Sequence, residues 1–436
     1  MIQIEKSETA DTRTCDDFAS VSKATLLASS AQHIGDVGQA LAFFGGMLTA
    51  AAVRHDRDKL TDIDGFHADF VTGFVQTGWW DRHRVLNRHH LEQEDGIPAD
   101  VNLIDVLDMI AAGLPIEKLR EIGPVSSVLA KLIRPTFIAP MGKLLVWGDW
   151  SAIEARVTPW LAATRDAEEA VLVPFRESDI DKTKPDVYVL NAAQVFKVYP
   201  DVLWERYMNG DPEAKAYRQG GKVMVLSLGF RGSVGALKAM AKNYGIRLSN
   251  EEAKTWVDGW RDRNRWNKRF GVKCEEAAFS AMRQPGSIMK AGRLSYQFVP
   301  KLMGGTLVCF LPDGRPIVYP RARIAKVEKF GQEQDAITYL NGMGYRHLWD
   351  GLQIENGTQA TAASILRQTL VRLDVEEKEA QIVLHTHDEV GGEVDETSAG
   401  AFAERLHETM VRGWDWTEGL PLAAEVSTSW YYTKAA

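Results

Sequence analysis

Two aspartates, Asp149 and Asp388, follow apolar, strand-like runs that lie far apart in the chain. Asp149 comes after LLVWG, and Asp388 comes after IVLHTH. The ends of distant strands can meet on neighbouring strands of one sheet, and two carboxylates that meet there can hold a pair of Mg²⁺ ions. Such ions activate an attacking hydroxyl and neutralise a leaving pyrophosphate. Taken singly, each aspartate fits a structural turn cap better than a catalytic role.

A second set of residues is spaced by four within the segment YRQGGKVMVLSLGFRGS: Arg218, Lys222, Leu226 and Phe230. This spacing places the four side chains along one face of a helix. Two cations one turn apart can hold the β- and γ-phosphates of a nucleoside triphosphate, and the aromatic ring can lie near the base or sugar. In isolation the pattern fits an ordinary amphipathic helix better.

Glu154 and Arg156 follow Asp149 in a segment expected to open a helix, with Ser151 as the N-cap and Glu154 at the capping-box position. Beside a metal site, Glu154 could press against a sugar and exclude a 2′-hydroxyl, and Arg156 could reach a phosphate or a base edge. The alternative for both is an exposed helical charge. In the segment that contains Arg218, four glycines (Gly220, Gly221, Gly229 and Gly232) are costly inside a helix, which predicts close approach of the backbone to another group, a template base being one candidate.

The elements expected around these residues are mixed helices and strands. They are a strand pair over 66–80, helices over 101–133, an irregular surface insertion over 165–185, a long helical block over 186–289, a hairpin strand over 311–324, a helix over 353–372, and two strands around a polar turn over 381–394.

Composition bounds the class of protein. The net charge of −8 counts against a protein that coats DNA, although an enzyme with a local basic cleft remains compatible with it. No apolar run approaches the length of about 18 residues that a membrane span needs. The three cysteines, Cys15, Cys274 and Cys309, show no metal-binding spacing, and this cysteine usage fits a reducing cytoplasm. We therefore expect a cytoplasmic protein, and the family resemblance described next implies a bacterial cell or a phage-infected host.

Three segments in one order carry a family resemblance: GDWSAIEARVTPWLA (148–162), RQGGKVMVLSLGFRGS (218–233) and HTHDEVGGEV (385–394). They resemble motifs A, B and C of the family A DNA polymerases, in particular the phage-type branch. Weaker matches extend the resemblance over residues 64–394. Three motifs in the family's order favour the catalytic interpretation over the structural ones given above.

The resemblance implies a role for each matching residue. The metal ligands would be Asp149, Asp388 and the carbonyl of Trp150, holding two Mg²⁺ ions, with Mn²⁺ as an alternative. Glu389 would be an auxiliary catalytic carboxylate. The remaining roles fall to residues that would bind the incoming dNTP (Arg218, Lys222, Tyr188, Leu226, Phe230 and the sugar-gating Glu154) and to residues that would contact the DNA (Arg156, His387 and Gln359). Lys222 would also protonate or neutralise the pyrophosphate.

The sequence departs from the family's pattern at two informative positions. Leu226 stands where the family usually has Phe or Tyr, and this position bears on sugar selection. Trp79 stands where a Thr-Gly-Arg pattern would place its arginine, and this position bears on minor-groove contacts.

The implied architecture is an α+β right hand with an antiparallel-sheet palm. We expect a reduced helical thumb over 1–63, a palm over 64–162 and 300–436, and helical fingers over 163–299. Only some 63 residues precede the first matching segment, so no 3′–5′ exonuclease is expected. The expected partners are primer-template DNA and dNTPs, without a membrane, and a processivity or replisome partner is left open.

Two alternatives stay open. One is a single-subunit RNA polymerase or a reverse transcriptase; Glu154 argues against ribonucleotide use because it would crowd a 2′-hydroxyl. The other is a catalytically inactive, polymerase-like DNA-binding protein. The intact set of Asp149, Asp388, Arg218 and Lys222 argues against the second alternative.

Overall fold

The computed structural model describes residues 103–111, 116–122, 125–329, 332–342 and 344–433. The expected thumb over 1–63 and the expected strand pair over 66–80 lie outside the described residues, as does Trp79. The described residues fall into two compact units, one made from 103–145 with 429–433 and the other from 146–428.

The first unit is built on short helices that pack their apolar sides together. Its core contains Leu107, Val128 and Trp430, and Ile138 pairs with Tyr431 in an antiparallel bridge. The helices expected over 101–133 are confirmed as α5 (Leu103–Ala111), α6 (Ile116–Ile122) and α7 (Val125–Leu132), followed by a 3₁₀ turn at Arg134–Thr136.

The second unit contains a four-stranded sheet in the order β11-β1-β10-β9. The apolar run before Asp149 forms β1, and the two strands expected around a polar turn form an antiparallel hairpin in which Glu389 pairs with Thr386. The strands are β1 (Lys143–Trp150), β9 (Gln381–Thr386), β10 (Glu389–Asp395) and β11 (Ala424–Ser429).

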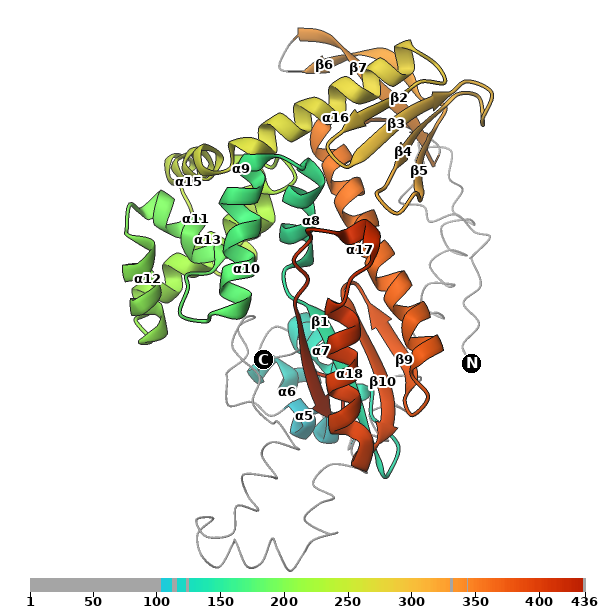
Figure 1. Ribbon diagram of the computed structural model, residues 1–436. Coiled ribbons are helices and arrows are strands. Elements are labelled where there is room, and N and C mark those ends of the chain that lie inside the picture. Colours follow the sequence, from blue (N-terminus) through green and yellow to red (C-terminus); the bar gives the residue numbers. More distant parts are fainter. Residues whose placement is uncertain (1–102, 112–115, 123–124, 330–331, 343, 434–436) are drawn as a thin grey trace, which may run out of the picture. The chain divides into compact units, whose positions relative to one another are not determined.

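Helix α18 lies against this sheet (Figure 1). It packs closely at positions where the strands carry glycine. A Cβ at Gly148 would run into the sulfur of Met410, and a Cβ at Gly392 would press on the ring of Phe402 at 3.0 Å. Glycine beside Asp149 is therefore required by packing. The helices that follow the strands are α17 (Asp350–Glu376) and α18 (Ala399–Val411), with 3₁₀ turns at Glu396–Ser398 and Asp415–Thr417.

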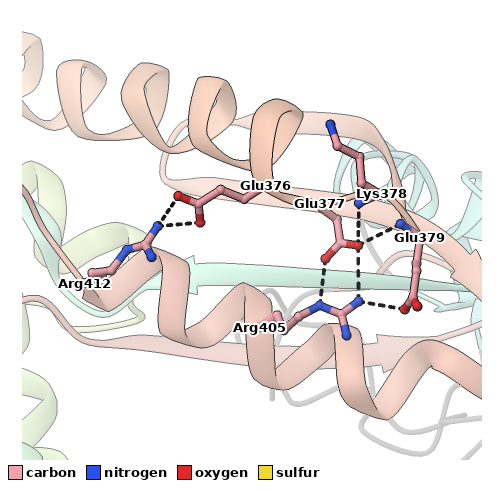
Figure 2. Close-up of polar contacts among 6 residues, drawn as sticks. All are labelled: Glu376, Glu377, Lys378, Glu379, Arg405 and Arg412. Atoms are coloured by element: carbon pink, nitrogen blue, oxygen red, sulfur yellow. Dashed lines mark hydrogen bonds and ion pairs between the residues drawn. The ribbon is translucent and has the colours of Figure 1, made fainter.

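Ion pairs connect the end of α17 and the residues after it to α18 (Figure 2). Arg405 donates to the Glu377 carboxylate at 2.9 and 3.2 Å and to Glu379 at 3.0 Å, and Arg412 donates to Glu376 at 2.7 Å. The Glu377 side chain is almost fully buried, so this contact is less screened by solvent than a surface pair. These contacts tie the two helices together next to the β9–β10 hairpin.

The segment over 165–185, expected to be an irregular insertion, is helical through Ile180, so that prediction is wrong. Val171, Leu172 and Phe175 recur at helical spacing and are buried, which the high charge of the segment concealed. The long helical block expected over 186–289 is confirmed as far as Arg283. The helical elements are α8 (Ile153–Ala162), α9 (Arg165–Ala167), a π-helical turn (Glu168–Leu172), α10 (Val173–Ile180), α11 (Val187–Phe196), α12 (Pro200–Met208), α13 (Pro212–Leu228), α14 (Val234–Asn243), α15 (Asn250–Arg263) and α16 (Arg265–Arg283).

Two further antiparallel sheets follow this block, and the expected hairpin over 311–324 is confirmed by the β4–β5 pair. Pairing of β3 with β4 joins residues on both sides of position 299. The α+β class with antiparallel sheets is thus confirmed. The strands are β2 (Ile288–Ala291), β3 (Leu294–Val299), β4 (Thr306–Phe310), β5 (Pro316–Pro320), β6 (Arg323–Lys329), β7 (Gln332–Asn341) and β8 (Gly344–His347). Among the described helices, none combines the length and apolar character needed to cross a membrane.

Candidate active site

The structure places the end of β1, which carries Asp149 and is followed by a turn, beside the β9–β10 turn that carries Asp388. β1 and β10 are neighbouring strands, and the backbone N–H of Trp150 donates to the carbonyl oxygen of Asp388 at 3.1 Å. Both aspartates are partly buried. Backbone pairing therefore fixes the relative positions of two residues that lie more than 200 positions apart in the sequence.

Each of these turns contains a non-glycine residue in the left-handed backbone region. Ala152 has φ of 52° and His387 has φ of 49°. Such conformations cost about 1–3 kcal/mol and tend to occur at functional sites. The predicted N-cap at Ser151 is wrong: α8 begins at Ile153, its N-cap is Ala152, and the backbone N–H of Ser151 donates to the carbonyl of Ala423.

Trp150 and Glu389 flank the aspartates and are buried, with 2% and 5% of their surfaces exposed. The indole N–H of Trp150 donates to the carbonyl of Met410 on α18 at 3.0 Å. The Trp150 side chain therefore anchors the sheet to α18, and only its backbone carbonyl is left for the metal role implied by the resemblance. Glu389 opens β10 directly after Asp388.

Glu154 lies in the first turn of α8, where Gln359 of α17 donates to its carboxylate at 3.2 Å. Burial raises the pKa of Glu154 above its ordinary value, the hydrogen bond from Gln359 opposes this, and the negative charges of Asp388 and Glu355 add to the increase. His387 acts in the opposite direction. The repulsion between Glu154 and Asp388 shows that the acidic groups of this site are electrostatically coupled.

Glu154, Leu226 and Phe230 line one largely apolar pocket together with residues of α11 and α15, including Trp260 and Asn264. Its cavity volume is about 40 Å³, which is enough for a few water molecules and too small for a sugar. The segment after Asp149 and the segment after Arg218 both line this pocket. The sequence interpretation requires these two segments to lie close together.

The prediction of one shared helical face for Arg218, Lys222, Leu226 and Phe230 is confirmed only in part. The first three lie on α13, which ends at Leu228, and Phe230 follows the C-cap residue Gly229. The ring of Phe230 therefore reaches the pocket from the chain after the helix.

Arg218 forms an ion pair with Asp186, whose carboxylate accepts from the Arg218 Nε at 2.7 Å. The other oxygen of Asp186 accepts from the backbone N–H of Val189 and caps α11. The guanidinium also lies 5.3 Å from the ring centre of Tyr188 and 4.8 Å from that of Tyr207. Burial, with the charge of Asp186 adding to it, raises the pKa of Tyr188 to about 12, so its hydroxyl stays protonated.

Lys222, one turn further along α13, lies 5.6 Å from the ring centre of Tyr244. Within the part of the chain that the structure describes, its ammonium has no carboxylate partner. Arg218 is thus a compensated cation and Lys222 an uncompensated one.

The glycines of this segment serve helix packing, which corrects the suggestion of a nearby template base. A Cβ at Gly221 would run into the backbone carbonyl of Tyr188 on α11, and one at Gly220 would meet the indole of Trp256 at 3.0 Å. The close approach predicted from these glycines is real, but the partner is the protein itself.

Arg156 does not reach a surface where DNA could touch it, with 2% of the residue exposed. Its guanidinium donates to both oxygens of Asp179 at 2.6 and 2.8 Å and to the carbonyl of Ser151, and it lies 4.1 Å from the ring centre of Phe175. The DNA contact assigned to Arg156 is therefore not supported by its position. His387 and Gln359, by contrast, are exposed.

Two acidic partners, Asp179 and Asp186, were missed by the sequence interpretation. Asp186 had a local signal, because an aspartate before an apolar helical run is a typical N-cap. Asp179 had none, since its pairing with Arg156 depends on how α10 packs against α8.

One curated relative is similar to this chain in sequence. The chain is 34% identical over 318 residues to the DNA polymerase of Bacillus phage SP02, a match that covers 72% of this chain and 44% of that protein. This chain is a relative of a phage DNA polymerase. This match supports the resemblance to DNA polymerases drawn from the three sequence segments, and the chain spans less than half the length of that relative.

No family model matches the chain. Among solved structures it is similar to the POL domain of Pol1 from M. smegmatis, in a complex with DNA primer-template and dNTP. The TM-score is 0.44, the sequence identity is 19%, and the match covers 69% of this chain and 42% of that one.

Proposed function

We propose that the chain is a DNA-directed DNA polymerase that extends a primer 3′-hydroxyl with dNTPs. The observation that carries the proposal is the hydrogen bond between Trp150 and Asp388, because it joins the strand ends that bear the two candidate catalytic carboxylates. The relationship to the phage enzyme supports the same function.

The donor chemistry at this edge of the sheet fits Mg²⁺. In the described residues no cluster of three or more His, Cys, Asp or Glu side chains is arranged to hold a metal ion. Mg²⁺ in nucleotide-dependent enzymes is usually bound by one or two carboxylates together with substrate phosphates, so a complete protein cage is not required. Asp149, Asp388 and the Trp150 carbonyl would hold the ions, and the repulsion between Asp388 and Glu154 would be relieved by a cation.

When bound, such ions lower the pKa of an attacking hydroxyl and stabilise the charge that develops on the phosphate oxygens. The protein supplies the positions of the acids, because β1 and β10 are neighbouring strands of one sheet. Glu389, buried beside Asp388, would contribute negative charge at the same edge.

Arg218 and Lys222 would bind the triphosphate. Lys222 is available as it stands, whereas Arg218 would exchange Asp186 for a phosphate oxygen. Arginine forms bidentate bonds with carboxylate and phosphate alike, so such an exchange preserves its hydrogen bonding. Tyr188, whose hydroxyl stays protonated, would donate to the same phosphates.

Glu154, Leu226 and Phe230 would contact the sugar and base of the incoming nucleotide. Because their shared pocket measures only about 40 Å³, it would have to open when the nucleotide binds. Glu154 would then exclude a 2′-hydroxyl, and Gln359 would hold it in place through their hydrogen bond. His387 and Gln359 would contact the primer terminus.

The right-hand assignment is part of the proposal. We infer a palm that contains the β11-β1-β10-β9 sheet and fingers that contain α9–α16. Since β3 pairs with β4, we place the boundary after Arg283 rather than at residue 299. The reduced thumb, the absence of proofreading and the cytoplasmic location stay predictions.

Primer extension with the full chain tests the function. Wild type is expected to extend a labelled primer on a DNA template in Mg²⁺, whereas Asp388→Ala is expected not to. Asp374→Ala, an exposed aspartate on α17, serves as the matched control. If Asp388→Ala extends primers as well as wild type does, the proposed function is wrong.

The same assay separates the alternatives. Wild type is expected to prefer dNTPs, and Glu154→Ala is expected to admit rNTPs. Equal use of both nucleotides by wild type would favour an RNA polymerase, and a strong preference for an RNA template would favour a reverse transcriptase. Binding of DNA without any extension would identify an inactive relative.

A further inference from the structure

A basic groove lies on the helical block, away from the carboxylates. Six cationic side chains line it: Arg231, Arg261, Arg265, Lys268, Arg269 and Lys273. Its cavity volume is about 550 Å³, and none of its lining residues is acidic. Such a concentration of positive charge contrasts with the net charge of −8 of the whole chain.

Half of these cations have a carboxylate partner. Arg231 pairs with Asp350 at 2.7 Å, Arg265 pairs with Asp262, and Arg269 pairs with Asp166.

The other half, Arg261, Lys268 and Lys273, have no carboxylate partner among the residues that the structure describes. Burial, with the charge of Arg231 adding to it, lowers the pKa of Arg261, and the charge of Asp258 opposes this decrease. Lys268 and Lys273 thus give the groove positive charge that no ion pair of the described residues neutralises.

Helix α16 adds to this charge. A helix N-terminus is the positive end of the helix dipole, where acidic side chains are stabilising and cations are not. The first turn of α16 instead carries Arg265 and Lys268 and no acidic residue, and the N-cap Asn264 makes no side-chain capping bond. An arrangement that costs folding stability in this way is suited to binding an anion.

The groove adjoins the candidate nucleotide pocket. Both are lined by Trp260 and Asn264, and Asn267 donates to the carbonyl of Gly229 at 2.6 Å, directly before Phe230. Arg218 lies ten residues before Leu228, the last residue of α13, a separation of about 15 Å along the helix, and Phe230 follows two residues later. A nucleotide with its phosphates at Arg218 and its base near Phe230 would have the groove beyond the base.

We propose that this groove binds the phosphates of the unpaired template strand that enters ahead of the templating base. The inference rests on the proposed function, because it places the nucleotide at α13. A single strand presents regularly spaced phosphates and a flexible backbone, which an open groove with several exposed cations can follow. Trp260 and the uncharged side chains of Asn264 and Asn267 are buried in the floor and support the cations.

Binding of the full chain to primer-template DNA tests the proposal. Two duplexes are compared by fluorescence anisotropy, one flush and one with a 5′ template overhang of about ten nucleotides. Wild type is expected to bind the overhang duplex more tightly. In Lys268→Gln/Lys273→Gln this advantage is expected to fall by roughly tenfold at low salt, and the salt dependence of overhang binding is expected to drop by about one unit of slope per lost phosphate contact.

The control is Lys182→Gln/Lys242→Gln, which removes the same charge from two exposed lysines that do not line the groove. It is expected to keep the overhang advantage. All four lysines are exposed and make no ion pair among the described residues, so folding is expected to be unaffected, and thermal melting checks this.

Three outcomes would overturn the proposal: no overhang advantage in wild type, an equal advantage in the groove variant, or an equal loss in the control variant. A poly-glutamate peptide that loses binding to the groove variant, while overhang binding is unchanged, would assign the groove to an acidic protein segment instead. Primer extension by wild type is read separately. A wild type that extends primers but shows no overhang advantage would refute the groove and leave the polymerase function standing.

Discussion

The strand edge that carries the acids and the helical block that carries the cations are built differently. At the strand edge, backbone hydrogen bonding between β1 and β10 fixes Asp149 and Asp388. In the helical block, side-chain pairs hold the charged groups, as in Arg218 with Asp186 and Arg231 with Asp350.

This difference separates two kinds of site. A position fixed by the backbone survives a change of side chain, so replacing an acid at the strand edge removes its chemistry and leaves the fold. A position fixed by a side-chain pair changes when either partner is replaced, or when a ligand competes for the pair. We call Asp149 and Asp388 the rigid centre, because backbone pairing fixes their positions. The paired cations of the helical block, by contrast, can exchange their carboxylate partners for a ligand.

The largest expected effect tests the rigid centre. Asp149→Asn and Asp388→Asn are each expected to lower the rate of primer extension by about 100-fold to 1000-fold, the scale of losing one positioned charged group. The double variant is expected to be little worse than either single one, because groups that act as a unit are not additive. Single-turnover extension measures the loss.

Thermal melting of the same variants is expected to match wild type and Asp374→Asn, since the strand pairing uses backbone groups. A fold that collapses in both single variants would contradict the comparison.

The next effect concerns Arg156, which is held by side-chain contacts. Arg156→Met is expected to destabilise the fold by about 3 kcal/mol, because it leaves Asp179 partly buried without its partner. Adding Asp179→Asn is expected to restore part of the loss, and urea denaturation of the four proteins measures the coupling. A stable Arg156→Met with weakened DNA affinity would instead return Arg156 to the DNA-contact role.

A smaller effect is expected where helices approach closely. Gly221→Ala places a methyl group against the carbonyl of Tyr188 and is expected to cost about 1–3 kcal/mol of stability. Gly235→Ala on α14 is the control, since nothing lies within 4 Å of its added Cβ, and it is expected to be neutral or slightly stabilising. Equal effects of the two substitutions in urea would show that the α11–α13 contact is not tight.

The smallest effect probes the burial of Glu154 beside the rigid centre. Because burial raises the pKa of Glu154 above its ordinary value of 4.5, the folded state holds this proton more tightly than the unfolded chain does. Stability is then lost as the pH rises from about that value through the raised pKa. Glu154→Gln removes this loss, so its melting temperature relative to that of wild type is expected to increase as the pH rises above about 4.5, by an amount on the order of one degree.

Glu276→Gln, which changes an exposed carboxylate on α16, is the control and is expected to show no such gain. A constant difference between Glu154→Gln and wild type as the pH rises would contradict the raised pKa of Glu154.

The sequence was informative where the local pattern controls the structure. The apolar runs before Asp149 and Asp388 predicted strands, and the turn at His387–Asp388 was placed correctly because a hairpin is a local element. The long helical block was predicted because its apolar spacing persists over many turns. The segment over 165–185 was misjudged because its charged residues outnumber the few apolar ones that are buried.

The residue types of the site were readable from the sequence, but their partners were not. Spacing alone placed Phe230 on the same helical face as Arg218, whereas the helix ends at Leu228. No residue near Arg156 in the sequence indicated that its side chain would be buried and paired with Asp179. That pairing requires α10 to fold back against α8.

By itself, the sequence determined which chemical groups are available and the local elements that carry them: paired aspartates after strands, and Arg218 with Lys222 one turn apart. Only the tertiary structure decided which of these groups meet. Strand order placed Asp149 beside Asp388, and helix packing buried Arg156 while leaving Lys268 exposed. The physical reason is that helix and strand patterns arise from neighbours in the chain, whereas ion pairing, burial and pKa shifts depend on groups that only folding brings together.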